Sequence, residues 1–322
     1  MHPNTPFLAV YMITYNHEKY IGQAIESIVS QRTNFNYKLF IGDDCSTDNT
    51  SIICEEFMQR HPDKIELLVH KKNIGATANA KSIYKKCIDS NAKYIAMCEG
   101  DDYWTDPYKL QKQIDFLEAN LDYAIHYTNA CYVVESENFV LNNKNKLVLE
   151  SIESKHIDQK LLLNQNIIIT LTTVFRNPYK PYPEWLLDVK LGDWSLHIIN
   201  SLGGKIFYSN ECTAVYRTHA KGIFSSLESS SQLLYYIETC KILESNLPEF
   251  KTQLKIGNHS RIIELLNLLY NKKDFLYYKI LFKNYSSLKA LPLLKQCIKG
   301  GLLLIRYTVN NIGINFKGPI KC

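Results

Sequence analysis

Residues 7–29 read FLAVYMITYNHEKYIGQAIESIV and change hydrophobic period part-way along. The first seven form an apolar run, which is typical of a strand buried on both faces of a sheet. The apolar residues that follow recur at the three- and four-residue spacing of an amphipathic helix, namely Ile21, Ala24, Ile25, Ile28 and Val29. This stretch therefore predicts a strand that leads into a helix, the repeating unit of α/β proteins.

The same alternation continues beyond residue 100. It predicts further strands at 37–41, 65–69 and 94–98, and helices at 48–60, 78–89 and after Asp106-Pro107. Ser46 or Thr47 is expected to cap the second helix, and Asp106 the fourth, with proline at its first position. Strands that alternate with helices predict a mainly parallel sheet flanked by helices, with right-handed crossovers.

The sequence beyond residue 120 is less regular. It predicts strands at 124–134, 167–175, 205–208 and 214–216, a short helix at 193–202 and a polar excursion at 135–155. From about residue 229 the pattern is helical to the end. We therefore expect an α/β domain over residues 1–222 and a helical, basic C-terminal extension over residues 223–322.

The composition, with 46% hydrophobic and 21% charged residues, is that of a globular protein and excludes disordered, collagen-like and disulfide-dense classes. No segment resembles a signal peptide or reaches the roughly 20 apolar residues of a membrane span; residues 300–305 come closest. The nine cysteines are scattered and form no C-x-x-C pair, so we expect reduced thiols and no zinc site. Together these features predict a cytoplasmic protein.

The net charge of +5 is unevenly distributed along the chain. Residues 223–322 carry a net charge of +8, and after Asp274 eight basic residues occur without an acidic one. Basic and apolar residues in one tail suggest contact with an anionic membrane surface. A helical cap with a solvated basic face explains the same composition. The tail contains no nucleic-acid-binding motif, so no nucleic-acid partner is expected.

Polar clusters follow three of the predicted strands: Thr14-Tyr15-Asn16, Asp43-Asp44 and Glu99-Gly100-Asp101-Asp102. Because ligands of parallel α/β sheets bind at the carboxyl ends of strands, these clusters are expected to converge on one crevice. Adjacent carboxylates repel each other unless a cation or hydrogen-bond donors offset the charge, and Mg²⁺ or Mn²⁺ binds carboxylates together with substrate phosphates. The alternative interpretation of the last cluster is a solvated acidic turn.

Four motifs then follow one another in chain order: TYNHEKYI (14–21), DDCSTDNT (43–50), NIG (73–75) and EGDD (99–102). In this order and spacing they resemble the family-2 glycosyltransferases, and the resemblance covers roughly residues 5–222. Such a resemblance implies the GT-A fold and sugar transfer with inversion.

The resemblance implies a nucleotide pocket built from the first three motifs. Thr14 and Tyr15 are expected to line it beside Glu18, and Asp44 to hydrogen-bond the uracil ring. Asn73, in the third motif, is assigned to the same pocket. Helix capping is the alternative role of the polar residues that follow Asp44, but it does not easily explain Asp44 itself.

The resemblance also implies the groups that carry the chemistry. Asp101 matches the acid near the ribose, and Asp102 the acid that binds the metal on the diphosphate. His219 matches a late histidine that reaches the metal or the diphosphate in some relatives. Asp193 matches the base that takes the proton from the acceptor hydroxyl. The alternative role of Asp193 is to cap the 193–202 helix, and that of His219 is structural packing.

The sequence departs from the family pattern at three places. Residues 99–102 replace the common Asp-x-Asp, no arginine follows the Asn73 motif, so that Lys81 is the nearest cation, and the Gln-x-x-Arg-Trp signature of processive synthases is absent. Because that signature is absent, we expect transfer of a single sugar. The resemblance implies a nucleotide-sugar donor, which we expect to be UDP-hexose or UDP-N-acetylhexosamine, and Mn²⁺ or Mg²⁺ as cofactor. The expected acceptor is a glycan or lipid-linked glycan at the cytoplasmic face of the membrane.

Other functions explain less of the sequence. A non-catalytic GT-A domain that serves as a glycan-binding scaffold has no need of Asp44, Asp102 and Asp193 together. A nucleotidyltransferase normally has a glycine-rich phosphate loop near its N-terminus, and residues 14–18 contain no glycine. A glycoside hydrolase needs two carboxylates about 5–9.5 Å apart, which adjacent acids do not provide.

Overall fold

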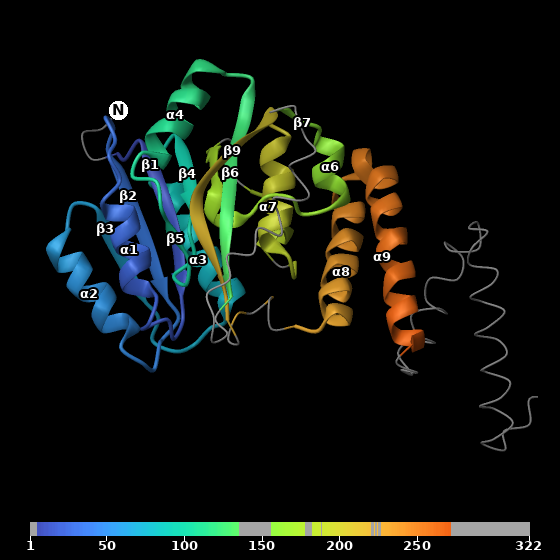
Figure 1. The fold of residues 1–322 in the computed structure, drawn as a ribbon, viewed down its shortest axis with the longest axis horizontal. Coiled ribbons are helices and arrows are strands. Elements are labelled where there is room, and N and C mark those ends of the chain that lie inside the picture. Colours follow the sequence, from blue (N-terminus) through green and yellow to red (C-terminus); the bar gives the residue numbers. More distant parts are fainter. Residues whose placement is uncertain are drawn as a thin grey trace, which may run out of the picture.

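A mixed β-sheet forms the centre of the protein in a computed structural model (Figure 1), which describes residues 5–134, 156–177, 182–187, 189–219, 222, 224 and 227–271. The first four strands are parallel and lie where the sequence predicts them: β1 (Leu8–Thr14), β2 (Tyr37–Asp43), β3 (Ile65–Val69) and β4 (Tyr94–Met97). They pair in the order β3-β2-β1-β4, so their carboxyl ends meet at one edge of the sheet.

The second half of the sheet is mixed in direction. Its strands are β5 (Tyr103–Trp104), β6 (Tyr123–Val134), β7 (His156–Ile157), β8 (Thr173–Arg176) and β9 (Lys205–Thr218). Strand β8 runs antiparallel to β4 and β6, whereas β9 pairs parallel with β6 and antiparallel with β5 and β7. The order among the described strands is β3-β2-β1-β4-β8-β6-β9-β5.

Two predicted strand boundaries are wrong. The separate strands expected at 205–208 and 214–216 form one strand of 14 residues, β9, because β6 pairs with it along its length. The β6–β9 pairing shifts register on both sides of Asn129, opposite the β9 residues that lie between the two predicted strands. The strand expected at 167–175 begins only at Thr173, because the 3-10 helix η1 (Thr170–Thr172) precedes it.

Helices cover both faces of the sheet (Figure 1). One face carries α1 (Ile21–Val29), α2 (Thr50–Arg60) and α4 (Lys109–Ala119), and the other carries α3 (Ala76–Asp89), α6 (Gln159–Asn164) and α7 (Gly192–Ser201). Successive residues of β1 enter the two cores in turn: Leu8, Val10 and Met12 pack with α1, whereas Ala9 and Tyr11 pack with α3. Burial on both faces explains the unbroken apolar run.

The described C-terminal helices, α8 (Ser229–Asn246) and α9 (Lys251–Asn271), share a core with the α/β domain. Leu243 of α8 and Leu254 of α9 belong to the same buried cluster as Trp194 of α7. Two short 3-10 helices, η2 (Glu184–Leu187) and η3 (Pro248–Phe250), complete the described elements. No helix among the described residues is long and apolar enough to cross a membrane. The 135–155 excursion and everything after residue 271, including the basic tail and residues 300–305, lie outside the described residues.

The caps of two helices differ from the prediction in detail. Helix α2 begins at Thr50, and neither Ser46 nor Thr47 caps it; the Asp48 carboxylate accepts a hydrogen bond from the Thr50 amide at 3.0 Å instead. The Ser46 hydroxyl is already engaged, because it donates to the carboxylate of Asp43. Asp106 accepts from the Tyr108 amide at 2.8 Å and so caps the turn that leads into α4.

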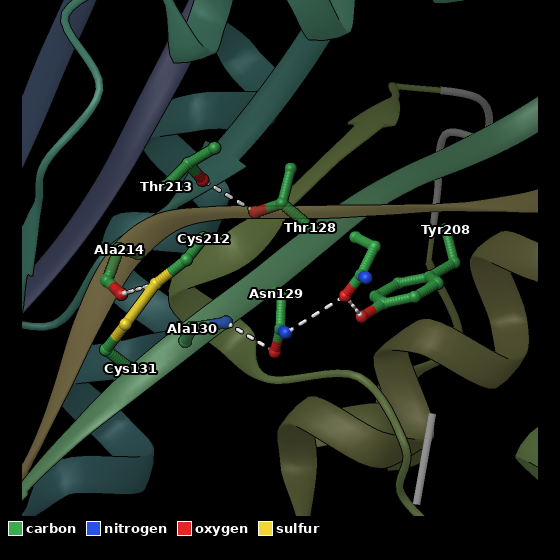
Figure 2. The surroundings of a disulfide bond; sticks show 9 residues. Thr128, Asn129, Ala130, Cys131, Tyr208, Cys212, Thr213 and Ala214 are labelled. Atoms are coloured by element: carbon green, nitrogen blue, oxygen red, sulfur yellow. Dashed lines mark hydrogen bonds between the residues drawn. A yellow bond between two sulfur atoms is a disulfide. The ribbon is translucent and has the colours of Figure 1, made fainter. Parts of the chain in front are cut away.

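The prediction that all nine cysteines are reduced thiols is wrong for one pair. Cys131 of β6 and Cys212 of β9 form a disulfide, with Cα atoms 6.3 Å apart (Figure 2). The two residues are 81 positions apart in the sequence, and only the β6–β9 pairing brings them together. The cysteines therefore no longer support the expectation of a cytoplasmic protein. Among the described residues the free cysteines are Cys45, Cys54, Cys87, Cys98 and Cys240.

Candidate functional site

The carboxyl ends of β1, β2 and β4 meet directly. The amide of Asp44 donates to the carbonyl of Thr14 at 3.1 Å, and the amide of Gly100 donates to the carbonyl of Ile13 at 3.0 Å. A Cβ atom on residue 100 would lie 2.7 Å from the Thr14 hydroxyl, so only glycine allows the acidic turn to approach β1 this closely. The three polar clusters therefore converge, as the strand order predicts.

The loop after β1 is fixed by the loop after β2. Asn16 adopts a left-handed conformation (φ 56°), and its side-chain oxygen accepts from the Thr47 amide at 2.8 Å. The Glu18 carboxylate accepts from the Asn49 amide at 3.2 Å, so this predicted pocket residue also ties the two loops together. Tyr15 is 41% exposed and is available to contact a ligand.

Asp44 fixes a third loop at the same edge. Its buried carboxylate accepts hydrogen bonds from the amides of Ile74, at 2.7 Å, and Gly75, at 2.9 Å. Asn73 accepts from the same Gly75 amide at 3.2 Å, and the left-handed φ of +86° at Gly75 favours glycine there. Asp44 therefore brings the Asn73 motif beside the first two clusters.

Asp101 lies between two histidines. Its Oδ2 atom is 3.0 Å from Nε2 of His219 and 3.8 Å from Nε2 of His17. Burial acts to raise the pKa of Asp101, but the hydrogen bond with His219 and the charge of His17 outweigh it and hold the pKa below its ordinary value. The three side chains offer ligand atoms within 4.8 Å of one another. Sequence reasoning missed His17, although it stands in the first quoted motif.

Asp102 is held by strand β9. It is 2% exposed, and its Oδ1 atom accepts from the backbone amide of Arg217 at 2.8 Å. Burial, and then the charges of Asp101 and Glu99, raise the pKa of Asp102 well above its ordinary value. The two adjacent acids therefore have different surroundings, which the sequence alone did not indicate.

Arg217 holds the acidic turn and was not among the predicted site residues. Its guanidinium donates to the carbonyl of Asp101 at 2.6 Å and to the side chain of Gln23 in α1. It also lies over the rings of Tyr103, 4.4 Å from the centroid, and Tyr20, at 5.2 Å. Arg217 thus joins β9, α1 and the turn after β4, and its cation is engaged in the protein.

Asp193 lies at the start of α7 but does not cap it. Leu191 occupies the N-cap position, and the carboxylate of Asp193 accepts instead from Asn166 at 2.8 Å and Thr170 at 3.3 Å. The capping role considered for Asp193 is therefore not what the structure shows. Both hydrogen bonds reach Oδ2 and orient the carboxylate, and no other described residue donates to Oδ1.

Glu99 links Asp193 electrostatically to the acidic turn. Desolvation of its enclosed carboxyl group, and then the charges of Asp101 and Asp193, raise the pKa of Glu99 to about 8. Glu99 is therefore the acid on which the charges of the acidic turn and of Asp193 both act. A proton on Glu99 at neutral pH lowers the repulsion among these acids.

The C-terminal helices support the segment that carries Asp193. The amide of Leu191, two residues earlier, donates to the hydroxyl of Thr239 in α8 at 3.2 Å. Arg261 of α9 lies over the ring of Trp194, 5.1 Å from its centroid. The described part of the extension therefore contacts Leu191 and Trp194, which lie on either side of the candidate base in the sequence.

A comparison with protein families identifies the family of the chain. The family model described as glycosyl transferase family 2 matches residues 9–180, which include the first four motifs. The chain belongs to glycosyl transferase family 2. An uncharacterized protein of Mycobacterium tuberculosis is 34% identical to this family-2 chain over 221 residues, which are 68% of the chain and 61% of that relative. The chain thus matches less than two thirds of the relative's length.

Solved structures show the same fold. TarS of S. aureus, determined in complex with UDP-GlcNAc, has a TM-score of 0.52 at 15% identity and covers 87% of this family-2 chain and 91% of its own. The mannosyltransferase PcManGT of Pyrobaculum calidifontis, determined with GDP-Man and Mn²⁺, has a TM-score of 0.57 at 13% identity, with coverages of 96% and 88%. At these identities the likeness establishes the GT-A fold alone.

Proposed function

We propose that this protein transfers a single sugar, with inversion, from a nucleotide sugar to an acceptor hydroxyl. One observation carries the proposal: backbone hydrogen bonds from Asp44 to Thr14 and from Gly100 to Ile13 bring the three polar clusters to one edge of the sheet. At this edge Asp101 lies 3.0 Å from His219 and 3.8 Å from His17. That site lies at the carboxyl edge of the sheet, where α/β proteins bind their ligands.

The proposed donor is UDP-hexose or UDP-N-acetylhexosamine. Its nucleotide is assigned to the edge where Thr14, the exposed Tyr15 and the loop at residues 73–75 meet. Asp44 supports this assignment because it holds that loop while its carboxylate can accept a further hydrogen bond from a base. TarS and PcManGT, bound to UDP-GlcNAc and GDP-Man, support a nucleotide-sugar donor in general.

The proposed cofactor is Mn²⁺ or Mg²⁺. Ligand atoms around a cation at about 2.1 Å lie roughly 3–4 Å apart, and the distances from Asp101 to His219 and His17 fall in that range. Asp101 and His219 are the residues that would hold the cation. Asp102, to which the sequence assigned it, has one oxygen committed to Arg217 and would support the turn. When bound, the cation offsets the charge on the leaving diphosphate.

In the proposed reaction Asp193 is the base. Asn166 and Thr170 hold its Oδ2 atom, so Oδ1 takes the proton from the acceptor hydroxyl. The acceptor oxygen bonds to the anomeric carbon from the face opposite the nucleotide, and the bond to the diphosphate oxygen breaks. The products are a glycoside whose anomeric configuration is inverted relative to the donor and a nucleoside diphosphate.

A panel of nucleotide sugars, assayed by release of nucleoside diphosphate with and without EDTA, tests the proposal. The Asp193→Asn variant should lose 10²–10⁴-fold in kcat while its affinity for the donor nucleotide stays within about twofold. Asn166→Ala, which removes a hydrogen bond but leaves the base, should lose less. No turnover with any donor, combined with glycan binding, would favour the scaffold function. Pyrophosphate release would favour the nucleotidyltransferase.

The acceptor, a glycan or lipid-linked glycan, and contact with an anionic membrane are proposed from the sequence alone. The second rests on the basic, apolar tail after Asp274. Sedimentation with phosphatidylglycerol vesicles should bring down the full chain but not one truncated after residue 271. Equal sedimentation of both forms would contradict a role of the tail.

A further inference from the structure

Two histidines from opposite parts of the chain approach the same oxygen atom. His17 follows β1 and His219 follows β9, and the Nε2 atoms of both face Oδ2 of Asp101, at 3.8 and 3.0 Å. Their side chains are 16% and 4% exposed, so both rings are largely enclosed. The cluster is therefore formed by the fold and is not a chance meeting of surface groups.

The backbone of His17 is fixed by neighbours on both sides. Its amide donates to the hydroxyl of Thr50 at 2.8 Å. The preceding residue, Asn16, is held in its left-handed conformation by the Ser46 hydroxyl, which accepts from its amide at 2.9 Å, and by the Thr47 amide, which donates to its side chain. The ring therefore points to Asp101 without any contribution from a ligand.

The rings around Asp101 also support one another. Tyr20 stacks on His219 with centroids 5.0 Å apart and an interplanar angle of 30°. His17 meets His219 edge to face at 6.1 Å and Tyr20 at 6.2 Å. Such packing restricts the orientation of both imidazoles, as expected of a preorganised ligand set.

We infer that His17 is a third protein ligand of the divalent cation, beside Asp101 and His219, and that this set selects Mn²⁺ over Mg²⁺. The inference rests on the cation of the proposed function but not on sugar transfer. Mg²⁺ is usually held by oxygen ligands alone, whereas first-row transition ions also accept imidazole nitrogen, Mn²⁺ the least tightly among them. Two imidazoles and one carboxylate therefore favour Mn²⁺, and the remaining positions can accept diphosphate oxygens.

Binding of Mn²⁺ to the full chain, followed by the EPR signal of the free ion, tests the inference without turnover. His17→Ala should raise the Kd for Mn²⁺ at least tenfold, while the Kd for Mg²⁺, measured by competition, should change less. His17→Asp supplies an oxygen ligand in place of nitrogen and should lower the preference for Mn²⁺ over Mg²⁺, measured as the ratio of the two Kd values. His61→Ala, at the far end of α2, is the matched control and should bind Mn²⁺ like the unaltered protein.

The outcomes separate this inference from the proposed function. Mn²⁺ affinity that is unchanged in both His17 variants overturns the inference, whatever the activity. Loss of affinity that depends on His17, in a protein that transfers no sugar, supports the inference and contradicts the function. Sugar transfer that persists in EDTA, with no Mn²⁺ bound, contradicts the inference but still supports the proposed transferase function. Circular dichroism of each variant identifies loss of folding, in which case His17→Asn replaces His17→Ala.

Discussion

Replacement of Lys109 by methionine is expected to stabilise the protein at neutral pH. Lys109 begins α4 and is fully buried, with Nζ 2.6 Å from Oε1 of Gln113 and 4.5 Å from the ring centroid of Trp104. Burial lowers its pKa from 10.5 to about 7, although the charges of Cys98 and Asp106 oppose the change. A methionine of similar length fills the same space without a charge.

The magnitude follows from the lowered pKa. A difference between 10.5 and about 7 corresponds to a cost of about 5 kcal/mol for the buried ammonium at low pH, because one pKa unit is ~1.4 kcal/mol. Methionine removes this cost but leaves Oε1 of Gln113 without its donor, which costs about 1–3 kcal/mol. Lys109→Met should therefore raise the free energy of unfolding by about 2–4 kcal/mol below pH 7.

The benefit should disappear as the pH rises. Between pH 7 and 10.5 the unfolded chain holds a proton on Lys109 that the folded protein has released, so the unaltered protein gains stability with pH. The variant lacks this gain, and its advantage should fall by about 1.4 kcal/mol per pH unit between pH 7 and 9. Below pH 7 both states are protonated, and the difference should be constant.

Urea unfolding followed by far-UV circular dichroism at pH 6, 7, 8 and 9 measures these differences. Lys85→Met is the matched control, because the Lys85 side chain is 76% exposed; it should change stability by less than about 0.5 kcal/mol at every pH. A Lys109→Met variant that is less stable at pH 7, or whose advantage does not vary from pH 7 to 9, would refute the reasoning.

Two further predictions concern the site. Gly100→Ala should displace the acidic turn, because its Cβ would lie 2.7 Å from the Thr14 hydroxyl; we expect a loss of about 1–3 kcal/mol in unfolding and at least 100-fold in kcat/KM. Gly22→Ala, whose Cβ meets nothing closer than 3.9 Å, should keep activity, and equal losses in both variants would contradict the account. Thr239→Val removes the acceptor of the Leu191 amide, so it should lower the free energy of unfolding by about 1–3 kcal/mol and lower kcat while the Kd for the donor stays the same. Thr239→Ser keeps the hydroxyl and should restore both the stability and kcat. An unaltered kcat in Thr239→Val would exclude a positioning role for Thr239.

The sequence predicted the regular half of the fold because local periodicity encodes it. The apolar run at residues 7–13 indicated burial on both faces, and β1 does enter two cores. The order of strands and helices then brought the polar clusters after β1, β2 and β4 to one edge, since the carboxyl ends of parallel strands meet there. Family membership also followed from motifs in this half.

The tertiary structure decided what depends on contacts between distant residues. Arg217 of β9 lies 115 positions from its partner Asp102, and His219, directly after β9, lies 118 positions from its partner Asp101. The Cys131–Cys212 bond depends in the same way on the β6–β9 pairing. No spacing rule encodes such pairs, because strand order and direction beyond β4 are set by packing and not by local period. For the same reason the sequence determined that two acids stand at this edge, whereas only the fold decided that Asp101 faces two histidines and Asp102 faces Arg217.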